Sequence, residues 1–423
     1  MARLYSTLKC FAGKLSKKSS FSYTMDLRSH YPYWLLRHGI INTYPSLTAN
    51  IKTDVVIMGG GITGALMAWY LCQAGVEAVV VDKRHIGMGS TAASTAMIQY
   101  EIDIPLYKLE KIAGEKNAAQ SYLLCYQSVL DLKAICKRLK GDTGFALKPS
   151  FQYASFKKDV AGLKKEQACR KKIGIQTEWL DEKAMLDRFG VEQYGGLLSE
   201  RGAELDPYGF THALLYAAIQ KGLKVFDRTK VTDIEHSHKK VVLTTEDKRK
   251  IQAKYLVIAC GYESQQYISK TVQRLHATYA IVSEPLSVAN LWYKNCLIWE
   301  TQTPYLYCRT TKDNRIIVGG KDDDKSPAAR DAALTQKTRL LEKAFHKLFP
   351  GIVFKTDFEW AGAFASTKDG LPYIGSIPEH PRTFFGLGLG GNGITFGILA
   401  AQIIRDRIQG KKNISENLFG FNR

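Results

Sequence analysis

Residues 53–84, TDVVIMGGGITGALMAWYLCQAGVEAVVVDKR, hold an apolar run, a glycine turn, a helical pattern and a second apolar run that ends in an acid. The first apolar run is typical of a strand buried in a parallel sheet. Gly59, Gly61 and Gly64 have the spacing GxGxxG, which permits a tight turn, close approach of a diphosphate and close packing of helix on strand. Asp82 follows 18 residues after Gly64, where an acid can bind ribose hydroxyls. Because a helix N-terminus also favours phosphate, this stretch predicts an α/β, Rossmann-type fold with a site for an ADP moiety.

Residues near this turn are predicted to contact the same ligand. The segment KRHIGMGSTAASTAMI is rich in small and hydroxyl side chains that can line a diphosphate or a ribityl chain, although a plain Ser/Gly turn has the same composition. A further apolar run in residues 253–264, AKYLVIACGYES, ends in small residues and indicates another close approach of the backbone. The predicted contacts in these segments are Ile62, Thr63, Lys83, Ser90, Thr91, Ser94 and Gly261.

A second glycine loop near the C-terminus distinguishes FAD from NAD. Residues 383–410, TFFGLGLGGNGITFGILAAQIIRDRIQG, again combine a strand, a glycine loop and a helix. An extended FAD needs a second helix N-terminus at its far end, where N–H groups stabilise the reduced ring, whereas NAD alone has no such need. The sequence therefore predicts FAD as the cofactor. The N–H groups expected at the ring belong to Gly391, Asn392, Gly393, Ile394 and Thr395.

Four motifs, in chain order, resemble those of one enzyme family. They are DVVIMGGGITG…VVVDK, YLVIACG, TKDGLPYIG and LGGNGITFG, and they resemble the D-amino-acid-oxidase-type FAD-dependent oxidoreductases, which include sarcosine, glycine and γ-glutamylputrescine oxidases. The resemblance covers about residues 30–420 and is greatest toward the γ-glutamylputrescine-oxidase side and a group of bacterial FAD-dependent oxidoreductases. It implies that flavin N5 takes a hydride from the carbon beside a nitrogen. It also implies that backbone at Val231 holds the adenine.

Two departures from the relatives concern the substrate and the attachment of the cofactor. Where sarcosine-type members carry a Lys for the substrate carboxylate just after the glycine loop, this chain has Thr395. Where they tether the flavin through a Cys on the preceding strand, this chain has Gly362 or Ala363, and STAASTAM contains no His for another tether. We therefore predict non-covalent FAD and a substrate unlike sarcosine.

The family implies an FAD-binding domain assembled from discontinuous segments and an α+β substrate domain with a mixed or antiparallel sheet. We assign residues 50–110, 201–264 and 359–423 to the FAD-binding domain, and residues 145–200 and 265–358 to the substrate domain. The segment 1–24 is basic and without acids. It has the composition of a transit peptide, but we interpret it as a dispensable extension from an upstream start codon.

The substrate side is expected on the strands of the second domain. In PYLYCRTT, strand alternation places Tyr305, Tyr307 and Arg309 on one face. The tyrosines can enclose an amine and its alkyl chain, and the guanidinium can bind a carboxylate, although an arginine paired within the fold is equally compatible. Asn392 is a further candidate for contact with the ring or the substrate. Tyr279 and Trp299 are weaker candidates, His212 and His276 are interpreted as structural, and DDDK at 322–325 is interpreted as a loop rather than a metal site.

Composition limits the partners and the location of the chain. The formal charge of +19 could attract nucleic acid, anionic lipid or an anionic substrate, but the lysines form no nucleic-acid-binding motif, so a solvated basic face is favoured. Eight dispersed cysteines indicate reduced thiols and a cytoplasmic location. The charge-free residues 384–404 have the length of a membrane span, yet five glycines in their first half disfavour a continuous helix.

Three functions remain open at this point. The first is an oxidase that breaks a C–N bond of an amine or amino-acid derivative, with oxygen as acceptor. The second is a dehydrogenase that passes electrons to quinone while its basic face contacts a membrane surface. The third is a flavin-binding assembly protein whose catalysis has lapsed. We favour the first. In the first two functions the flavin supplies the chemistry itself, so no separate catalytic machinery is required of the protein.

Overall fold

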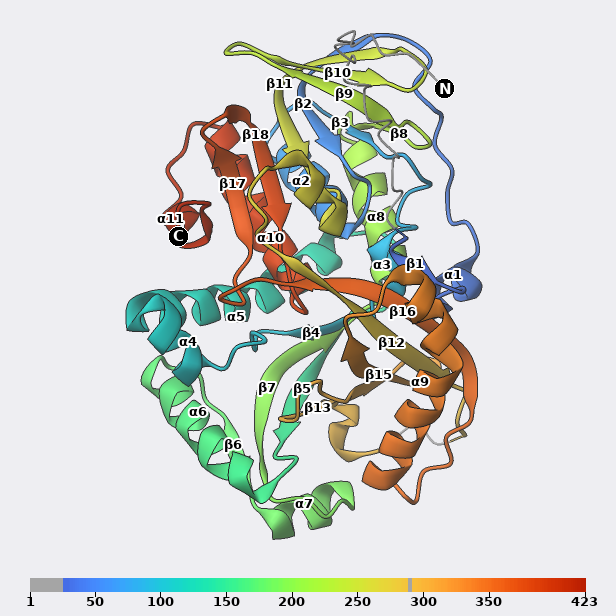
Figure 1. The fold of residues 1–423 in the computed structure, drawn as a ribbon, viewed down its shortest axis with the longest axis vertical. Coiled ribbons are helices and arrows are strands. Elements are labelled where there is room, and N and C mark those ends of the chain that lie inside the picture. The colour runs from blue at the N-terminus through green and yellow to red at the C-terminus, as the bar shows by residue number, and fades with distance from the viewer. Residues whose placement is uncertain (1–25, 288–290) are drawn as a thin grey trace, which may run out of the picture.

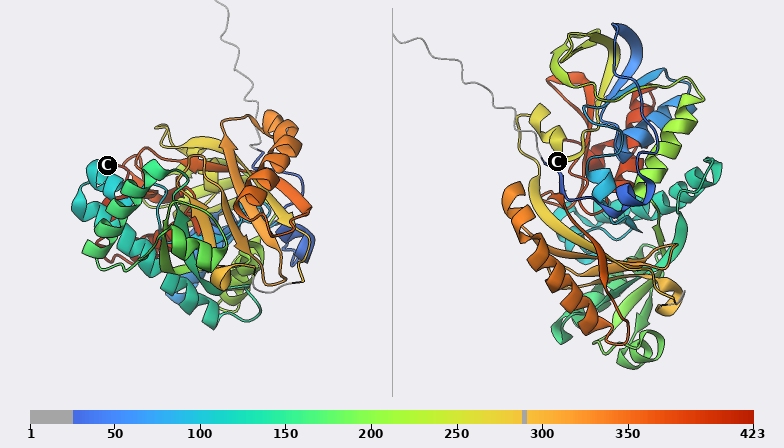
Figure 2. Two further views of the ribbon diagram at one scale, coloured as in Figure 1. Left: turned by 90° about the horizontal axis from the view of Figure 1, so that it is seen from below. Right: turned by 90° about the vertical axis from the view of Figure 1, so that its right-hand side faces the viewer.

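Two β-sheets organise the chain. The computed structural model describes residues 26–287 and 291–423, and the extension 1–24 lies outside these residues. The sheets lie one above the other in Figure 1 and are called the upper and lower sheet below. The side view in Figure 2 shows that the two layers meet across the middle of the molecule. The chain passes between the two sheets several times, so each sheet is built from separated segments.

The upper sheet has a parallel centre. Its strand order is β17–β18–β11–β2–β3–β8, with β10 and β9 added beside β11. In β2, Val55 and Ile57 face the helices whereas Val56 and Met58 face β10, so both faces are buried and the strand is continuously apolar. The strands are β2 Ile51–Met58, β3 Ala78–Val81, β8 Lys224–Phe226, β9 Val231–His236, β10 Val241–Thr245, β11 Lys250–Ile258, β17 Tyr373–Ile377 and β18 His380–Leu387.

Helix α2 lies at the centre of a helical layer beside the upper sheet. It packs against α8, α10, β2 and β3, while α10 also packs against β17 and β18, and α5 packs on α10. α8 begins at Pro207, a residue favoured at the first helical position, and Asp206 caps it by accepting hydrogen bonds from the N–H groups of Tyr208 and Gly209. The bounds are α2 Ile62–Gln73, α5 Glu115–Arg138, α8 Pro207–Ile219 and α10 Gly393–Ile408.

The lower sheet is mixed and has ten strands in the described ranges. Its order is β1–β16–β12–β15–β14–β13–β5–β7–β4, with β6 paired to β7. The β13–β5 pair is parallel, and its neighbours β13–β14 and β5–β7 are antiparallel, which confirms the predicted mixed sheet. The strands are β1 Arg28–Ser29, β4 Met97–Gln99, β5 Ala146–Tyr153, β6 Glu178–Leu180, β7 Gly196–Glu204, β12 Arg274–Ser283, β13 Leu297–Glu300, β14 Tyr307–Thr310, β15 Ile316–Asp323 and β16 Thr356–Ser366.

The remaining helices lie around the lower sheet and at the edges of the fold. The longest of them, α9, packs against β12, β15 and β16. The bounds are α1 Tyr33–His38, α3 Ser90–Ala93, α4 Leu106–Ala113, α6 Val160–Lys172, α7 Glu182–Phe189, α9 Pro327–Leu348 and α11 Glu416–Phe419, with 3-10 helices η1 Lys157–Asp159, η2 Gly261–Tyr267 and η3 Tyr293–Asn295.

The sheets divide the chain differently from the expected domains at three points. β4, within the expected FAD-binding segment 50–110, pairs with β7 of the lower sheet. Residues 201–204 complete β7, and β16 pairs with β12, although residues 201–264 and 359–423 were assigned to the other domain. The physical reason is that strand periodicity indicates which face of a strand is buried but not which sheet the strand joins.

The charge-free residues 384–404 do not form one helix. They are divided between β18 and α10, with the glycine loop between these elements. In the two described ranges, none of the helices combines the length and the apolar character that a membrane crossing requires.

Candidate functional site

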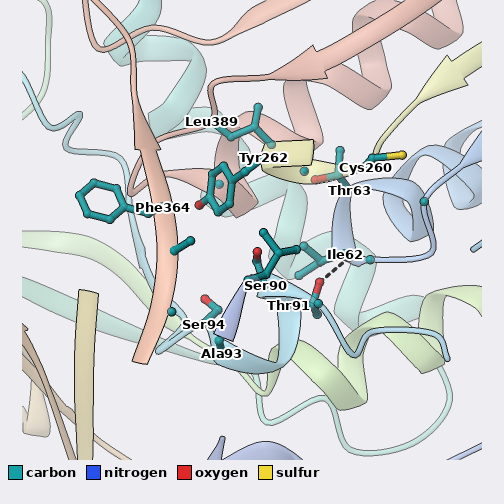
Figure 3. A pocket seen from close by; sticks show the side chains of 18 of the residues that line it. Ile62, Thr63, Ser90, Thr91, Ala93, Ser94, Cys260, Tyr262, Phe364 and Leu389 are labelled. Atoms are coloured by element: carbon teal, nitrogen blue, oxygen red, sulfur yellow. Dashed lines mark hydrogen bonds between the residues drawn. The ribbon is translucent and has the colours of Figure 1, made fainter. Parts of the chain in front are cut away.

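A cavity of about 270 Å³ lies between the two sheets and is lined by residues from both. In Figure 3, Ser90, Thr91 and Ser94 lie on one side of it, and Tyr262 extends from η2 toward β16, which carries Phe364. Two predicted residues, Gly64 and Arg309, do not line the cavity. The predicted residues that do are Gly59, Gly61, Ile62, Thr63, Asp82, Lys83, Ser90, Thr91, Ser94, Val231, Gly261, Tyr305, Tyr307, Gly391, Asn392, Gly393, Ile394 and Thr395.

The β2–α2 turn presents backbone to the cavity because side chains do not fit there. A Cβ on Gly59 would lie 2.4 Å from the carbonyl oxygen of Ala259, and the φ of +111° at Gly59 also favours glycine. A Cβ on Gly64 would lie 1.9 Å from the carbonyl oxygen of Gly59. Thr91 Oγ1 accepts a hydrogen bond of 2.9 Å from the N–H of Ile62. Gly64 therefore acts behind the turn, where it lets helix and strand approach.

Asp82 fixes the same turn from the end of β3. Its carboxylate accepts hydrogen bonds from the N–H of Gly60 at 2.6 Å and of Arg84 at 2.7 Å. Burial raises the pKa of this carboxyl, and the two N–H groups oppose that rise. Glu263 of η2 pairs with Lys83 at 2.8 Å and with Arg84 at 2.9 Å. The contact of Asp82 with ribose stays a prediction.

The loop between β18 and α10 is attached to the segment around β4. Asn392 Nδ2 donates hydrogen bonds to the carbonyl oxygens of Gln99 at 3.1 Å and Glu101 at 2.8 Å. The N–H of Gly391 donates to Asp103 at 3.0 Å, and a Cβ on Gly391 would lie 2.8 Å from that carboxylate. The amide nitrogen of Asn392 thus positions the loop, while its predicted contact with ring or substrate stays a prediction.

The two glycine loops fit FAD. The first turn of α2, together with Asp82, suits a diphosphate and a ribose, and the N-terminus of α10 suits a ring that becomes anionic on reduction. The cofactor can approach the backbone closely at Gly59 and Gly391, because glycine has no side chain. A Cβ at either position would clash with neighbouring protein atoms. Gly362 and Ala363 of β16 also line the cavity and carry no group that could bond covalently to flavin.

Two tyrosines line the cavity on the side of the lower sheet. The ring centroids of Tyr305 and Tyr307 lie 5.7 Å apart. Glycines of β15 make room for them, since a Cβ on Gly319 would lie 2.3 Å from the Tyr307 hydroxyl oxygen and a Cβ on Gly320 would lie 2.3 Å from the Tyr305 carbonyl oxygen. Burial raises the pKa of Tyr307 to about 12, so its hydroxyl is neutral near pH 7. We call this region the tyrosine end; its lining residues are Tyr262, Thr278, Tyr305, Tyr307 and Asp322.

Sequence reasoning did not single out Asp322, which ends up at the tyrosine end. The first two residues of DDDK belong to β15, so the interpretation of 322–325 as a loop is wrong for them. Asp322 Oδ1 is shielded from solvent and has no hydrogen-bond partner among the described residues. Burial raises the pKa of Asp322 to about 6, whereas the Thr278 hydroxyl lowers it and nearby Asp103 raises it. The local signal was the glycine pair Gly319 and Gly320 in the same strand, over which the Tyr307 ring and the Tyr305 backbone lie.

Asp103 and Tyr262 are two further residues that the sequence did not reveal. Asp103, between β4 and α4, accepts hydrogen bonds from the N–H of Gly391 and, at 3.4 Å, from the hydroxyl of Tyr305. Burial raises the pKa of Asp103, and burial also raises that of Tyr262, to which the Asp103 charge adds. Asp103 and Tyr305 are 202 positions apart in the chain, so no local pattern connects them.

The structure corrects the prediction for Arg309. Its side chain is 2% exposed, and Nε donates a hydrogen bond of 2.7 Å to the carbonyl oxygen of Thr95. Its other nitrogens bind Glu204 at 3.2 Å and the carbonyl oxygen of Leu205 at 3.1 Å. Arg309 lies on β14 beyond the cavity, near the start of α8. Its guanidinium is paired within the fold and does not reach a substrate carboxylate in the cavity.

The weaker candidates also have partners within the fold. The Tyr279 hydroxyl donates to Asp323 at 3.2 Å, and the Trp299 indole donates to Ser150 Oγ at 3.2 Å. Burial lowers the pKa of His212 to about 4, so its ring is neutral near pH 7. Among the described residues, no group of His, Cys, Asp or Glu side chains is arranged to hold a metal ion.

Known proteins share this fold and these segments. The family model for FAD dependent oxidoreductases, DAO, matches residues 54–407. Gamma-glutamylputrescine oxidoreductase of Escherichia coli (strain K12) is 27% identical over 380 residues, which cover 87% of this chain and 86% of that protein. Glycine oxidase of Bacillus licheniformis is 28% identical over 370 residues, which cover 85% of this chain and 94% of that protein. The crystal structure of glycine oxidase from Geobacillus kaustophilus has the same fold, with a TM-score of 0.73 at 21% identity over 86% of this chain and 96% of that one.

Proposed function

The chain belongs to the FAD dependent oxidoreductase (DAO) family, and from this premise we propose that it oxidises a C–N bond of an amine or amino-acid derivative. The observation that carries the proposal is the position of the tyrosine end, which shares one cavity with the loop that begins α10. FAD, when bound, supplies a two-electron acceptor for the hydrogen on the carbon beside the nitrogen. The names of the relatives, which act on glycine and on gamma-glutamylputrescine, support a nitrogen-containing substrate.

The residues divide into those that hold the cofactor and those that hold the substrate. The β2–α2 turn, Asp82 and the loop before α10 would hold FAD without a covalent bond. Tyr305 and Tyr307 would enclose the substrate and exclude water from the reacting carbon. A cytoplasmic location is part of the proposal and is supported by the dispersed cysteines, which are free thiols wherever the structure describes them.

Oxygen is the proposed electron acceptor. The amine loses a hydride from carbon and a proton from nitrogen, the resulting imine takes up water, and a carbonyl compound and ammonia or a smaller amine leave. Oxygen receives the two electrons with two protons and becomes hydrogen peroxide. The name glycine oxidase, which some of the relatives carry, supports this acceptor.

The proposal is tested by mixing the purified holoenzyme with amines and amino acids in the absence of oxygen. We expect the flavin absorption to bleach and to return when oxygen is admitted, with one peroxide formed per substrate oxidised. If the flavin absorption returns faster with a soluble quinone than with oxygen, the proposal of oxygen as acceptor is overturned. The proposed C–N oxidation still stands in that case. If dithionite reduces the flavin but no amine or amino acid does, the proposed C–N oxidation is overturned. That result would favour a protein whose catalysis has lapsed.

A further inference from the structure

The tyrosine end carries acidic but no cationic side chains. Among the described residues that line the cavity, the cations are Lys83, Arg84 and Lys230. All three adjoin the upper sheet, since Lys83 and Arg84 follow β3 and Lys230 precedes β9. Glu263 pairs with Lys83 and Arg84. A carboxylate that bound at the tyrosine end would therefore have no counter-ion and would face Asp322.

Cations behind the lining strands are already paired. Arg309 binds Glu204 and two backbone carbonyls. Lys337 of α9 binds Asp323 at 2.7 Å. Burial raises the pKa of Asp322 to about 6 and outweighs Lys337 and His276, which lower this pKa. The carboxylate of Asp322 is therefore only partly compensated by cations of its own layer.

The carboxylate of Asp322 brings a negative charge to the tyrosine end. Asp322 lines the cavity, although its Oδ1 is shielded from solvent and is therefore not part of the cavity wall. The side chain thus acts on a ligand in the cavity through its charge. A ligand with a positive charge lowers the cost of keeping this carboxylate ionised.

Aromatic rings surround the same place. Tyr305 and Tyr307 lie 5.7 Å apart, and Trp299 lies edge-on to Tyr305 at 6.1 Å. Tyr262 comes from the opposite layer, so tyrosine rings line this end of the cavity on the sides of both sheets. The faces of such rings attract ammonium groups and pack against the methylenes next to them.

From the charge of Asp322, the lack of cations among the residues of the tyrosine end and the rings, we propose that the substrate is a cationic amine without a carboxylate on its reacting carbon. Asp322 is its counter-ion, and Tyr305 and Tyr307 are the walls that contact its alkyl groups. Asp103 is a positioning residue, because it holds the Tyr305 hydroxyl and the N–H of Gly391. This inference rests on the proposed function and narrows it from amines and amino acids to amines.

Binding of ions that do not react tests the inference without turnover. The holoenzyme is titrated with tetramethylammonium and, separately, with acetate, while the flavin absorption spectrum is followed. We expect tetramethylammonium to perturb the spectrum and to compete with the amine, and acetate to do neither. Asp322→Asn should raise the dissociation constant for tetramethylammonium at least about tenfold. The matched control Asp324→Asn, which alters an exposed carboxylate paired with Arg274 and His276, should bind like the wild type.

Anaerobic reduction with butylamine and with glycine separates this inference from the proposed function. We expect butylamine to reduce the flavin at concentrations at least about tenfold below those needed for glycine. Reduction by glycine in preference to butylamine, or tighter binding of acetate than of tetramethylammonium, would overturn the inference and leave C–N oxidation standing. If dithionite reduces the flavin but neither butylamine, glycine nor any other amine or amino acid does, the proposed function is overturned. The inference then falls with it.

Discussion

At Gly64, helix α2 and the carbonyl oxygen of Gly59 come so close that an added Cβ would lie 1.9 Å from that oxygen. Because the clash is with backbone, the Gly64→Ala variant must shift the helix away from the strand. We expect a dissociation constant for FAD at least about tenfold higher and a lower Tm. Gly351→Ala is the matched control, since a Cβ there meets nothing within 4 Å, and it should change the free energy of unfolding by less than about 0.5 kcal/mol. Equal FAD affinity in the two variants would contradict this role.

We expect the Asp322 carboxylate to favour binding of a cationic ligand but to lower the free energy of unfolding near pH 7. Its folded-state pKa of about 6 exceeds the ordinary value of 3.8, so folding favours the protonated carboxyl. Its contribution to stability is therefore present below the ordinary value and is lost as the pH rises toward the folded-state pKa. Asn carries no such charge, so Asp322→Asn should be more stable than the wild type by about 1–2 kcal/mol at pH 7, and equally stable near the ordinary pKa.

Urea unfolding of both proteins at the two pH values measures this difference. A wild type that is more stable than Asp322→Asn at pH 7 would show that the carboxylate has a stabilising partner within the fold.

At the scale of elements, α6 supports the glycine loop from a distance. Arg170 on α6 is 2% exposed and binds Glu166 at 2.8 Å, the Tyr100 hydroxyl at 3.1 Å and Glu101 at 3.4 Å. The carbonyl oxygen of Glu101 in turn accepts the hydrogen bond from Asn392. A buried ion network therefore connects a helix of the lower layer to the start of α10.

Arg170→Ala should be strongly destabilising because it leaves two buried carboxylates without their cation. We expect a loss of about 3–5 kcal/mol in the free energy of unfolding, together with weaker FAD binding. Arg188→Ala on α7 removes an arginine paired with Glu178 at the surface and should cost less than about 1 kcal/mol. Chemical denaturation and FAD titration of both variants provide the comparison, and similar losses in the two would contradict the proposed support of the loop.

Periodicity within a strand indicates which side chains share a face, but the contacts between strands decide which of them reach the cavity. The pattern PYLYCRTT led to the cavity for Tyr305 and Tyr307, yet Tyr305 precedes β14. Gly319 of β15 makes room for the Tyr307 ring, and Gly320 makes room for the backbone of Tyr305. Arg309 shares the pattern but lies beyond the cavity, where Glu204 takes its charge. Alternation thus indicates a face, whereas the position along that face depends on which strands are neighbours.

In the whole molecule, the parts of the site that are close together in sequence could be predicted, whereas the parts that are far apart in sequence could not. The β2–α2 turn is made by residues that are consecutive in sequence, so its glycines and Asp82 could be recognised locally. The loop before α10 could be recognised for the same reason. Asp103 and Tyr305 meet across 202 positions, and only the approach of the two sheets brings them together. The cavity-lining residues of the two glycine loops could therefore be predicted from local patterns, whereas Asp103 and Asp322 could not.

We conclude that the cavity between the two sheets holds FAD without a covalent bond. The decisive measurement is the visible absorption spectrum of the purified protein, taken before and after acid precipitation. We predict flavin bands in the intact protein that pass entirely into the supernatant when the protein is precipitated. A colourless protein that FAD does not reconstitute, or flavin that stays with the precipitate, would contradict the claim.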